Sequence, residues 1–197
     1  MLGFWLMQRR MQRARRRVGC PQPAARGFTL VELMAVVAIT GILATLGIAT
    51  LRQRAFASDV TSAKIVVRTI VAAEEHYRAE NQVYLNVSTP GNSGWYPRVP
   101  GKNAKYSFLA TTHADSLQWR KLGPDVRQPV TFGFKANAGL PDTAPVLDNE
   151  LASTTLPAMV EPWYLVQARA DADGDGVGCM VAAASWSPEI FSINDGE

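Results

Sequence analysis

A run of 24 residues, from Phe28 to Leu51, carries only one charged side chain, Glu32. About 20 apolar residues in a helix cover the ~30 Å hydrocarbon core of a bilayer, so this run is long enough to span a membrane. A carboxylate within such a span is costly, and it is therefore a candidate functional group. The run predicts a long apolar helix, and any fold proposed for the chain has to include that helix.

Residues 1–27 contain seven arginines and no acidic residue, whereas the remaining 170 residues carry 13 basic and 17 acidic side chains. The formal net charge of +3 therefore hides a C-terminal part with a net charge of −4. By the positive-inside rule, the arginines stay in the cytoplasm and the C-terminal part crosses the membrane. Because the body of the chain is acidic, we expect no nucleic-acid partner.

A secretory signal peptide does not fit this N-terminus, because its apolar region is shorter and its cleavage site follows that region. Here the best processing site, Gly27, precedes the apolar run. A plain signal anchor is an alternative interpretation, but an anchor needs neither Gly27 nor an acid four residues after Phe28. Met7 and Met11 are alternative start positions.

Gly27 followed by Phe28-Thr29-Leu30-Val31-Glu32 resembles the processing site of type IV pilins and of the pseudopilins of type II secretion. The resemblance implies that a prepilin peptidase cuts after Gly27 and that Phe28 becomes a methylated N-terminus. It also implies that Glu32 acts in assembly, pairing with the amine of a neighbouring subunit in a helical filament. Glycine suits the cleavage position because it has no side chain to block a peptidase.

The chain departs from the family pattern at two points. Many pilins close a C-terminal loop with a disulfide, but Cys179 is the only cysteine after Gly27. We expect Cys179 to be buried among its apolar neighbours. Many major pilins also carry a proline in the second half of the apolar run, and this chain has none there.

Helical periodicity continues beyond the apolar run, at Phe56, Val60, Ala63, Val67, Ile70 and Tyr77. This stripe predicts one helix from about Phe28 to Glu80, apolar in its first half and amphipathic in its second. A break at Ser58-Asp59 is the alternative, because both residues are good N-caps. Glu74 and Arg78 have the i,i+4 spacing of a favourable ion pair.

The rest of the chain predicts a small antiparallel sheet. Residues 86–105 have the composition of a surface loop, and Asp115 to Leu122 predict a short helix capped by Asp115. The expected strands are Tyr106–Thr111, Val130–Lys135, Trp163–Ala170, Val177–Ala184 and Glu189–Ile193. The expected fold class is α+β, a long N-terminal helix with a transmembrane first half, packed on this sheet. The pilin resemblance implies the same fold.

This organisation predicts three parts of the chain. Residues 1–27 are a basic leader peptide, and residues 28–55 are the membrane-spanning and assembly half of the helix. Residues 56–197 form a periplasmic or extracellular head that includes the second half of the helix.

Asp171, Asp173 and Asp175, followed by Gly176, match the opening of a calcium loop. The twelfth position from Asp171 is Ala182 rather than a glutamate, and Asp-Gly pairs are also ordinary hairpin turns. Both interpretations, a Ca²⁺ site and a turn, stay open on the sequence.

Two further patterns carry little functional weight. Aromatic and cationic residues alternate around Trp95 and Tyr96, as in single-strand nucleic-acid contacts, but a loop with its aromatic rings tucked onto the head fits better. The two histidines, His76 and His113, lie in no catalytic motif, so we expect no catalytic residue and no enzyme activity.

These observations predict a structural subunit of a type IV pilus-like filament. Its expected partners are a prepilin peptidase and other pilin subunits. We expect it first in the inner membrane, as a single-pass protein with a cytoplasmic N-terminus, and then in a pilus or pseudopilus. A pseudopilin of a type II secretion system is the alternative within the class. A single-pass membrane-anchored binding module is the alternative from another class.

Overall fold

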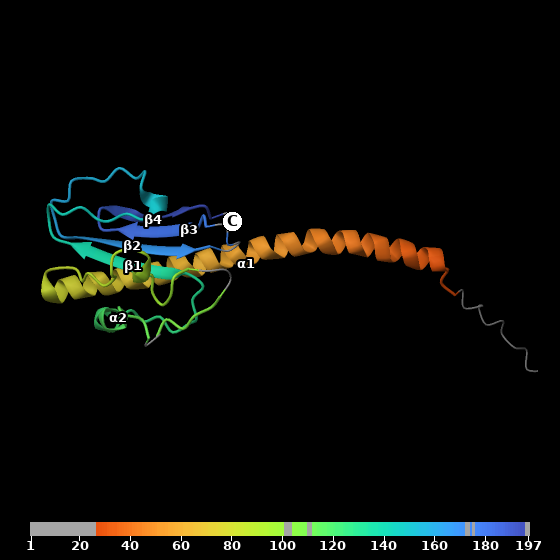
Figure 1. Ribbon diagram of the computed structural model, residues 1–197, viewed down its shortest axis with the longest axis horizontal. Helices are drawn as coiled ribbons and strands as arrows, with labels where there is room; N and C mark the ends of the chain where they lie inside the picture. The colour runs from red at the N-terminus through yellow and green to blue at the C-terminus, as the bar shows by residue number, and fades with distance from the viewer. Residues whose placement is uncertain (1–26, 101–103, 110–111, 172–173, 175, 196–197) are drawn as a thin grey trace, which may run out of the picture. The chain divides into compact units, whose positions relative to one another are not determined.

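The computed structural model describes residues 27–100, 104–109, 112–171, 174 and 176–195 (Figure 1). The chain divides into two compact units, residues 1–43 and residues 44–197, with the boundary inside the long helix α1. Helix α1 spans Leu30–Asn81 and helix α2 spans Ser116–Leu122. The four strands are β1 (Gly133–Gly139), β2 (Trp163–Ala170), β3 (Cys179–Ala184) and β4 (Ser187–Ile193). This combination of a long helix and an antiparallel sheet confirms the predicted α+β class.

Helix α1 is continuous across Ser58 and Asp59, so the alternative of a break there is wrong. The helix continues because its next turn is held by the head: Val60 and Ala63 are 4% and 2% exposed. It ends where Gln82 adopts a positive φ of 63° and its backbone N–H donates to the Arg78 carbonyl at 2.7 Å. The observed bounds lie within two residues of those predicted.

The first unit contributes the N-terminal part of α1. Its large apolar side chains are exposed, from 53% at Val36 to 82% at Phe28. In the part of the chain that the structure describes, no helix combines the length and apolar character needed to cross a membrane.

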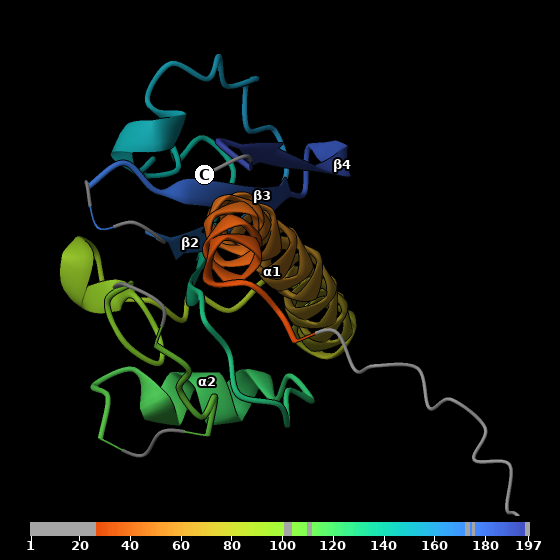
Figure 2. The ribbon, with the colours of Figure 1, turned by 90° about the vertical axis from the view of Figure 1, so that its right-hand side faces the viewer.

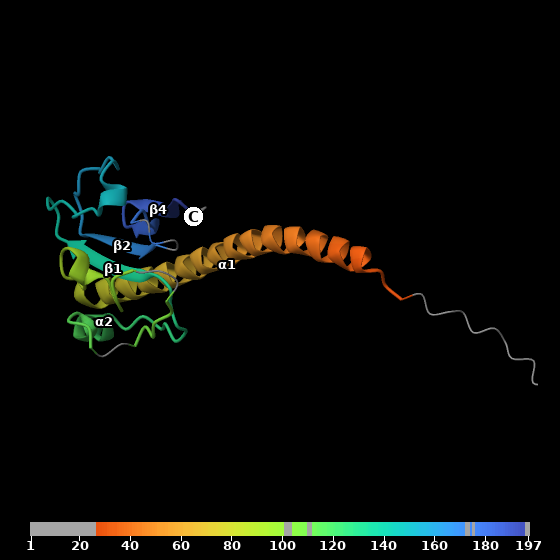
Figure 3. The same cartoon turned by 45° about the vertical axis from the view of Figure 1, so that its right-hand side comes forward.

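The four strands form one antiparallel sheet in the order β1-β2-β3-β4. β1 and β2 pair from Gly133 with Arg169 to Gly139 with Trp163, and β2 continues into β3 with Ala170 opposite Cys179. In the second unit, the sheet lies on one side of the C-terminal part of α1 and α2 lies on the other (Figures 1, 2 and 3).

The main core lies between α1 and the sheet. The α1 stripe contributes Val60, Ala63, Val67 and Ile70, as predicted. It shares one cluster with alternate residues of the first three strands: Phe134, Ala136, Tyr164, Val166, Ala168, Cys179, Val181 and Ala183. Cys179 is fully buried, as expected.

The other face of the sheet is covered by the segment of residues 140–162, which crosses above the strands in Figure 1. Leu151 of this segment packs with Trp95 and Met180, and Met159 packs near Trp163 and Leu165. Because both faces are covered, β2 and β3 are buried at almost every position instead of at alternate ones.

Three local predictions are corrected by the structure. Tyr106–Thr111 is not a strand in its described residues; Tyr106 makes only an isolated bridge to Val130. Of the stretch predicted from Val130, only Gly133 onward is strand. Helix α2 forms where expected and ends at Gly123 in the left-handed conformation, but the Asp115 side chain does not cap it. That carboxylate instead accepts hydrogen bonds from the backbone N–H and hydroxyl of Thr89.

Candidate processing and assembly site

The segment before α1 is extended and exposed. Gly27, Phe28 and Thr29 precede the first helical residue, Leu30. A side chain built at Gly27 would meet no atom within 4 Å, and the Phe28 side chain is 82% exposed. The peptide bond between Gly27 and Phe28 therefore lies outside regular secondary structure, as a peptidase substrate must.

Thr29 and Glu32 cap the start of α1 reciprocally. The Glu32 carboxylate accepts hydrogen bonds from the backbone N–H and from the hydroxyl of Thr29, both at 2.8 Å. The Glu32 N–H donates to the Thr29 hydroxyl oxygen at 3.2 Å. This is a capping box, which satisfies donors that a helix N-terminus otherwise leaves without partners. Glu32 therefore has a local role in this chain, and its predicted assembly role stays a prediction.

The N-terminal part of α1 satisfies its own polar groups. The Thr40 hydroxyl donates to the carbonyls of Val36, at 2.8 Å, and Val37, at 3.1 Å. What remains on the surface is an apolar helix with exposed Val, Ile and Leu side chains. Exposed apolar surfaces of this kind mark sites of interaction with other proteins or with membranes.

The comparisons with known proteins concern this same region. A family model of the prokaryotic N-terminal methylation motif matches residues 23–48, which include Gly27, Phe28 and Glu32. This match and the two relatives described next support the resemblance to type IV pilins and pseudopilins. The family resemblance of the N-terminal sequence is thereby confirmed.

Two curated relatives extend the match. The type IV major pilin protein PilA of Myxococcus xanthus is 29% identical over 140 residues, 66% of this chain and 61% of the relative. The type II secretion system core protein G of Pseudomonas aeruginosa is 43% identical over 58 residues, 29% of this chain and 41% of the relative. The chain thus spans less than two thirds of the length of either relative. No solved structure matches it significantly.

The predicted calcium site lies mostly outside the described residues, because Asp173 and Asp175 are not among them. Asp171 is described, and its carboxylate accepts the backbone N–H groups of Gly174 at 2.7 Å and Gly176 at 3.2 Å. These bonds close a turn before β3. The described residues include no group of three or more side chains able to hold a metal ion. Calcium binding stays a prediction.

The aromatic residues of the loop 86–105 face inward. Trp95 and Tyr96 are 1% and 2% exposed, and Tyr96 stacks with Trp119 at a ring distance of 5.1 Å. Their ring faces are therefore used inside the head and are not presented to bases. Arg98 lies over the Tyr106 ring at 5.5 Å, and Lys102 lies outside the described residues.

His76, His113 and Cys179 each contact different parts of the structure. His76 lies 3.5 Å from Glu80 on the exposed face of α1. His113 accepts the Asp115 backbone N–H at 3.1 Å beside α2. Cys179 is buried in the core. The three groups thus lie in three different surroundings: the exposed face of α1, the start of α2 and the core.

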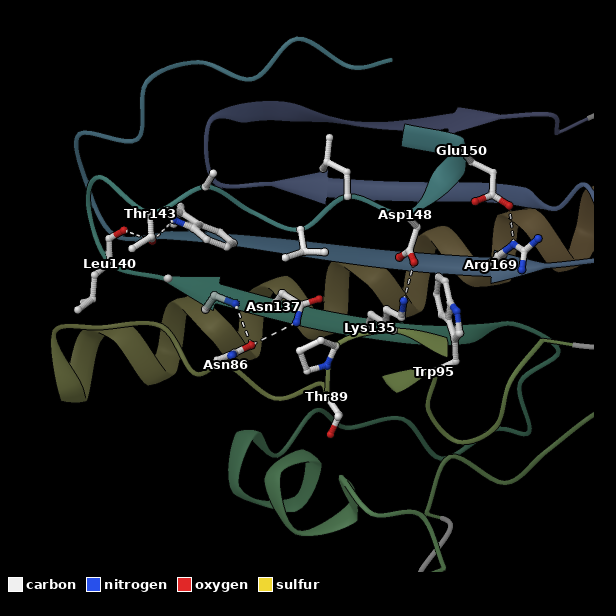
Figure 4. A pocket seen from close by; sticks show the side chains of 18 residues that line it. Asn86, Thr89, Trp95, Lys135, Asn137, Leu140, Thr143, Asp148, Glu150 and Arg169 are labelled. Atoms are coloured by element: carbon white, nitrogen blue, oxygen red, sulfur yellow. Dashed lines mark hydrogen bonds and ion pairs between the residues drawn. The ribbon is translucent and has the colours of Figure 1, made fainter. Parts of the chain in front are cut away.

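A cavity of about 690 Å³ lies between β1, the loop 86–95 and the segment 140–162 (Figure 4), and no sequence pattern predicts it. Lys135 points across it to Asp148, with 2.7 Å between Nζ and Oδ1. Arg169 and Glu150 form a second ion pair at 2.6 Å. The two cations and two carboxylates neutralise one another, so these pairs hold the segment 140–162 on the sheet and leave no net charge for a ligand.

Glu74, for which the sequence spacing predicts an ion pair, lies in the core instead. It is fully buried on α1, and the predicted ion pair with Arg78 is wrong. Arg78 instead donates to the Tyr84 hydroxyl at 2.8 Å and lies 3.7 Å from Glu161. The available signal was spacing: Glu74 follows Ile70 by four residues and so continues the apolar stripe.

Proposed function

We propose that the chain is a structural subunit of a type IV pilus-like filament, processed by a prepilin peptidase and polymerised through the N-terminal part of α1. The observation that carries this proposal is the methylation-motif match over residues 23–48, which spans the cleavage position and the first turns of the helix. The accessible Gly27–Phe28 bond and the exposed apolar helix support it.

In this proposal, residues 1–27 are the leader and residues 28–55 hold the subunit in the inner membrane before assembly. Residues 56–197 form the head outside the cytoplasm. Its partners are the peptidase and other pilin subunits. Head-to-tail contacts between identical subunits do not close on themselves, so they build a helical polymer.

A pseudopilin of a type II secretion system is the second candidate. The observation that favours it is the 43% identity over 58 residues to the core protein G of such a system. Electron microscopy of sheared surface fibres, with mass spectrometry of their subunits, separates the two candidates. A long surface fibre containing this chain supports the pilus. Its absence from surface fibres, with a secretion defect on deletion, supports the pseudopilus.

The processing step is tested by the intact mass of the chain extracted from membranes. We expect a mature N-terminus at Phe28 that carries one additional methyl group in a host with the peptidase, and an uncut chain in a host without it. The matched variant Gly27→Leu should remain uncut, because its side chain obstructs the approach to the backbone. A chain that begins at Met1, Met7 or Met11 in a peptidase-competent host contradicts the proposal and favours the membrane-anchored binding module.

A further inference from the structure

Glu74 is a buried carboxyl group with only half of its hydrogen bonding satisfied. The residue is 0% exposed and follows Ile70 on the core stripe of α1. Its Oε2 accepts the backbone N–H of Leu85 at 3.0 Å, whereas its Oε1, fully buried, has no hydrogen-bond partner in the described structure. A buried ionised carboxylate needs a cation or several donors, and a protonated one needs far less.

In the part of the chain that the structure describes, no cation pairs with Glu74. On α1, its neighbour Glu75 adds negative charge, and it accepts a hydrogen bond from the Tyr84 hydroxyl at 2.9 Å. Arg78 is directed to that same hydroxyl and to Glu161. From the sheet, the Tyr164 ring packs edge-on against Tyr84 at 4.9 Å.

Burial raises the pKa of Glu74 from 4.5 to about 7, with the Leu85 N–H opposing this rise and the charge of Glu75 adding to it. The pKa of Tyr164 is raised to about 12 by burial and by the nearby acids, so this tyrosine stays neutral and adds no further negative charge. Glu74 therefore changes its charge near neutral pH, inside the core.

The N–H that Glu74 holds belongs to the segment that joins α1 to the sheet. After Leu85, the N–H groups of Val87 and Ser88 donate to the Ala136 carbonyl of β1, at 3.1 and 3.0 Å. The next residue, Thr89, is bound by Asp115 beside α2. The segment Leu85–Thr89 is thus hydrogen-bonded to α1, to β1 and to the residue before α2. Glu74 accepts the hydrogen bond on α1.

We propose that Glu74 is a proton-operated latch between α1 and the segment Leu85–Thr89. In its protonated form, the carboxyl fits the core and keeps the Leu85 N–H in place. In its ionised form, the uncompensated charge favours states in which water reaches Glu74, and these states require that Leu85–Thr89 moves away from α1. The head is accordingly closed at mildly acidic pH and opens locally at this junction as the pH rises.

Hydrogen exchange of the full chain in detergent, followed by mass spectrometry of peptides that cover residues 82–89, tests the latch. After correction for intrinsic exchange, the protection of these amides should fall at least about tenfold, the factor that one pKa unit represents, between about pH 5 and about pH 8.5. Glu74→Gln, which cannot ionise, should keep its protection over the same range. The matched control Glu80→Gln, an exposed acid of α1 beside His76, should behave as wild type.

A second variant keeps the test decisive if Glu74→Gln does not fold. Glu74→Met removes the ionisable group and fills similar volume, so its exchange should be independent of pH, although faster at Leu85. Protection in the wild-type chain that does not change with pH overturns the proposal. A pH dependence that persists in either Glu74 variant overturns it as well.

Discussion

Glu74 and Lys135 are both almost fully buried, at 0% and 3% exposed, but their surroundings differ. The Lys135 ammonium has a carboxylate at 2.7 Å and the face of Trp95 at 4.2 Å. The described contacts of Glu74 include one backbone N–H and no cation. These two contacts offset the free-energy cost of removing the Lys135 charge from water. Among the described residues, no comparable contact offsets that cost for an ionised Glu74. Lys135 is therefore a buried charge that stabilises a contact, whereas the carboxyl of Glu74 fits the core only in its neutral, protonated form.

At the residue scale, the stability of the head should fall as the pH rises from about 4.5 to about 7, because of Glu74. In this window the folded chain retains a proton that the unfolded chain has lost, so unfolding releases a proton and is favoured by higher pH. The shift of the pKa from 4.5 to about 7 corresponds to on the order of 3 kcal/mol.

The measurement is equilibrium unfolding of the full chain in detergent, followed by tryptophan fluorescence at several pH values. Glu74→Gln should flatten the curve in this window and leave the two proteins similar in stability at the acidic end. If the curves of the wild type and of Glu74→Gln run parallel, the carboxyl of Glu74 does not titrate differently in the folded and unfolded chains.

At the scale of elements, the segment 140–162 is held on the sheet by the Lys135–Asp148 pair. Asp148→Ala should destabilise the head by about 3 kcal/mol, because it leaves a buried ammonium without its carboxylate. The matched control is Asp125→Ala. Asp125 pairs with Arg127 at 2.8 Å, but both side chains are more than two thirds exposed, so the loss should stay below about 1 kcal/mol. Denaturant unfolding of both variants provides the comparison, and equal losses would show that the cavity pair is not effectively buried.

Some elements were predictable from the sequence because local pattern and tertiary burial agree in them. The α1 stripe repeats from Phe56 to Tyr77, and β2 has the predicted bounds Trp163–Ala170 because most of its residues are apolar or aromatic. The stretch from Tyr106 failed for the opposite reason. Phe108 packs against Trp119 at 5.4 Å, so its aromatic character reflects a ring cluster and not a strand.

The candidate site divides in the same way. Gly27, Phe28 and Glu32 are adjacent in sequence, and a local motif is sufficient to find them. The cavity was unpredictable because Lys135 and Arg169 pair with Asp148 and Glu150, which lie in the segment between β1 and β2. No sequence motif relates the positions of these partners. Glu74 was assigned to Arg78 by the local i,i+4 rule, whereas a backbone N–H eleven residues away decides its position.

The turn before β3 provides a separate element-scale prediction. If Asp171, Asp173 and Asp175 bind calcium in the folded state only, a hundredfold excess over the dissociation constant stabilises the head by about 2.7 kcal/mol. The full chain should then melt at a higher temperature in millimolar calcium than with chelator, and Asp173→Ala should abolish the difference. The same melting temperature in both conditions identifies the segment as an ordinary turn, closed by the two N–H groups that Asp171 already accepts.

At the scale of the whole molecule, the two units differ in how their apolar side chains are covered. The head buries its apolar residues in its own core, whereas the N-terminal part of α1 leaves an apolar surface exposed. If the subunit is built into a filament, that surface moves from the lipid of the membrane to contacts with the helices of neighbouring subunits. The apolar side chains supply attraction without direction, so the register of subunits has to come from a polar group. Glu32 is the only charge in the run from Phe28 to Leu51.

The last prediction separates the two roles of Glu32, as a cap of α1 and as an assembly charge. Glu32→Gln keeps the capping box, since glutamine also accepts from the helix N-terminus, but removes the charge. Thr29→Ala removes the hydroxyl half of the box and keeps the charge. If pairing with a neighbouring subunit sets the register, Glu32→Gln and Glu32→Ala should both reach the membrane at wild-type levels and fail to enter filaments, while Thr29→Ala assembles. Filament incorporation is measured by immunoblotting sheared fibres against the membrane fraction. Normal incorporation of Glu32→Gln, with failure of Thr29→Ala, would instead assign Glu32 to the cap alone, because only the hydrogen bonds at the helix start would then matter.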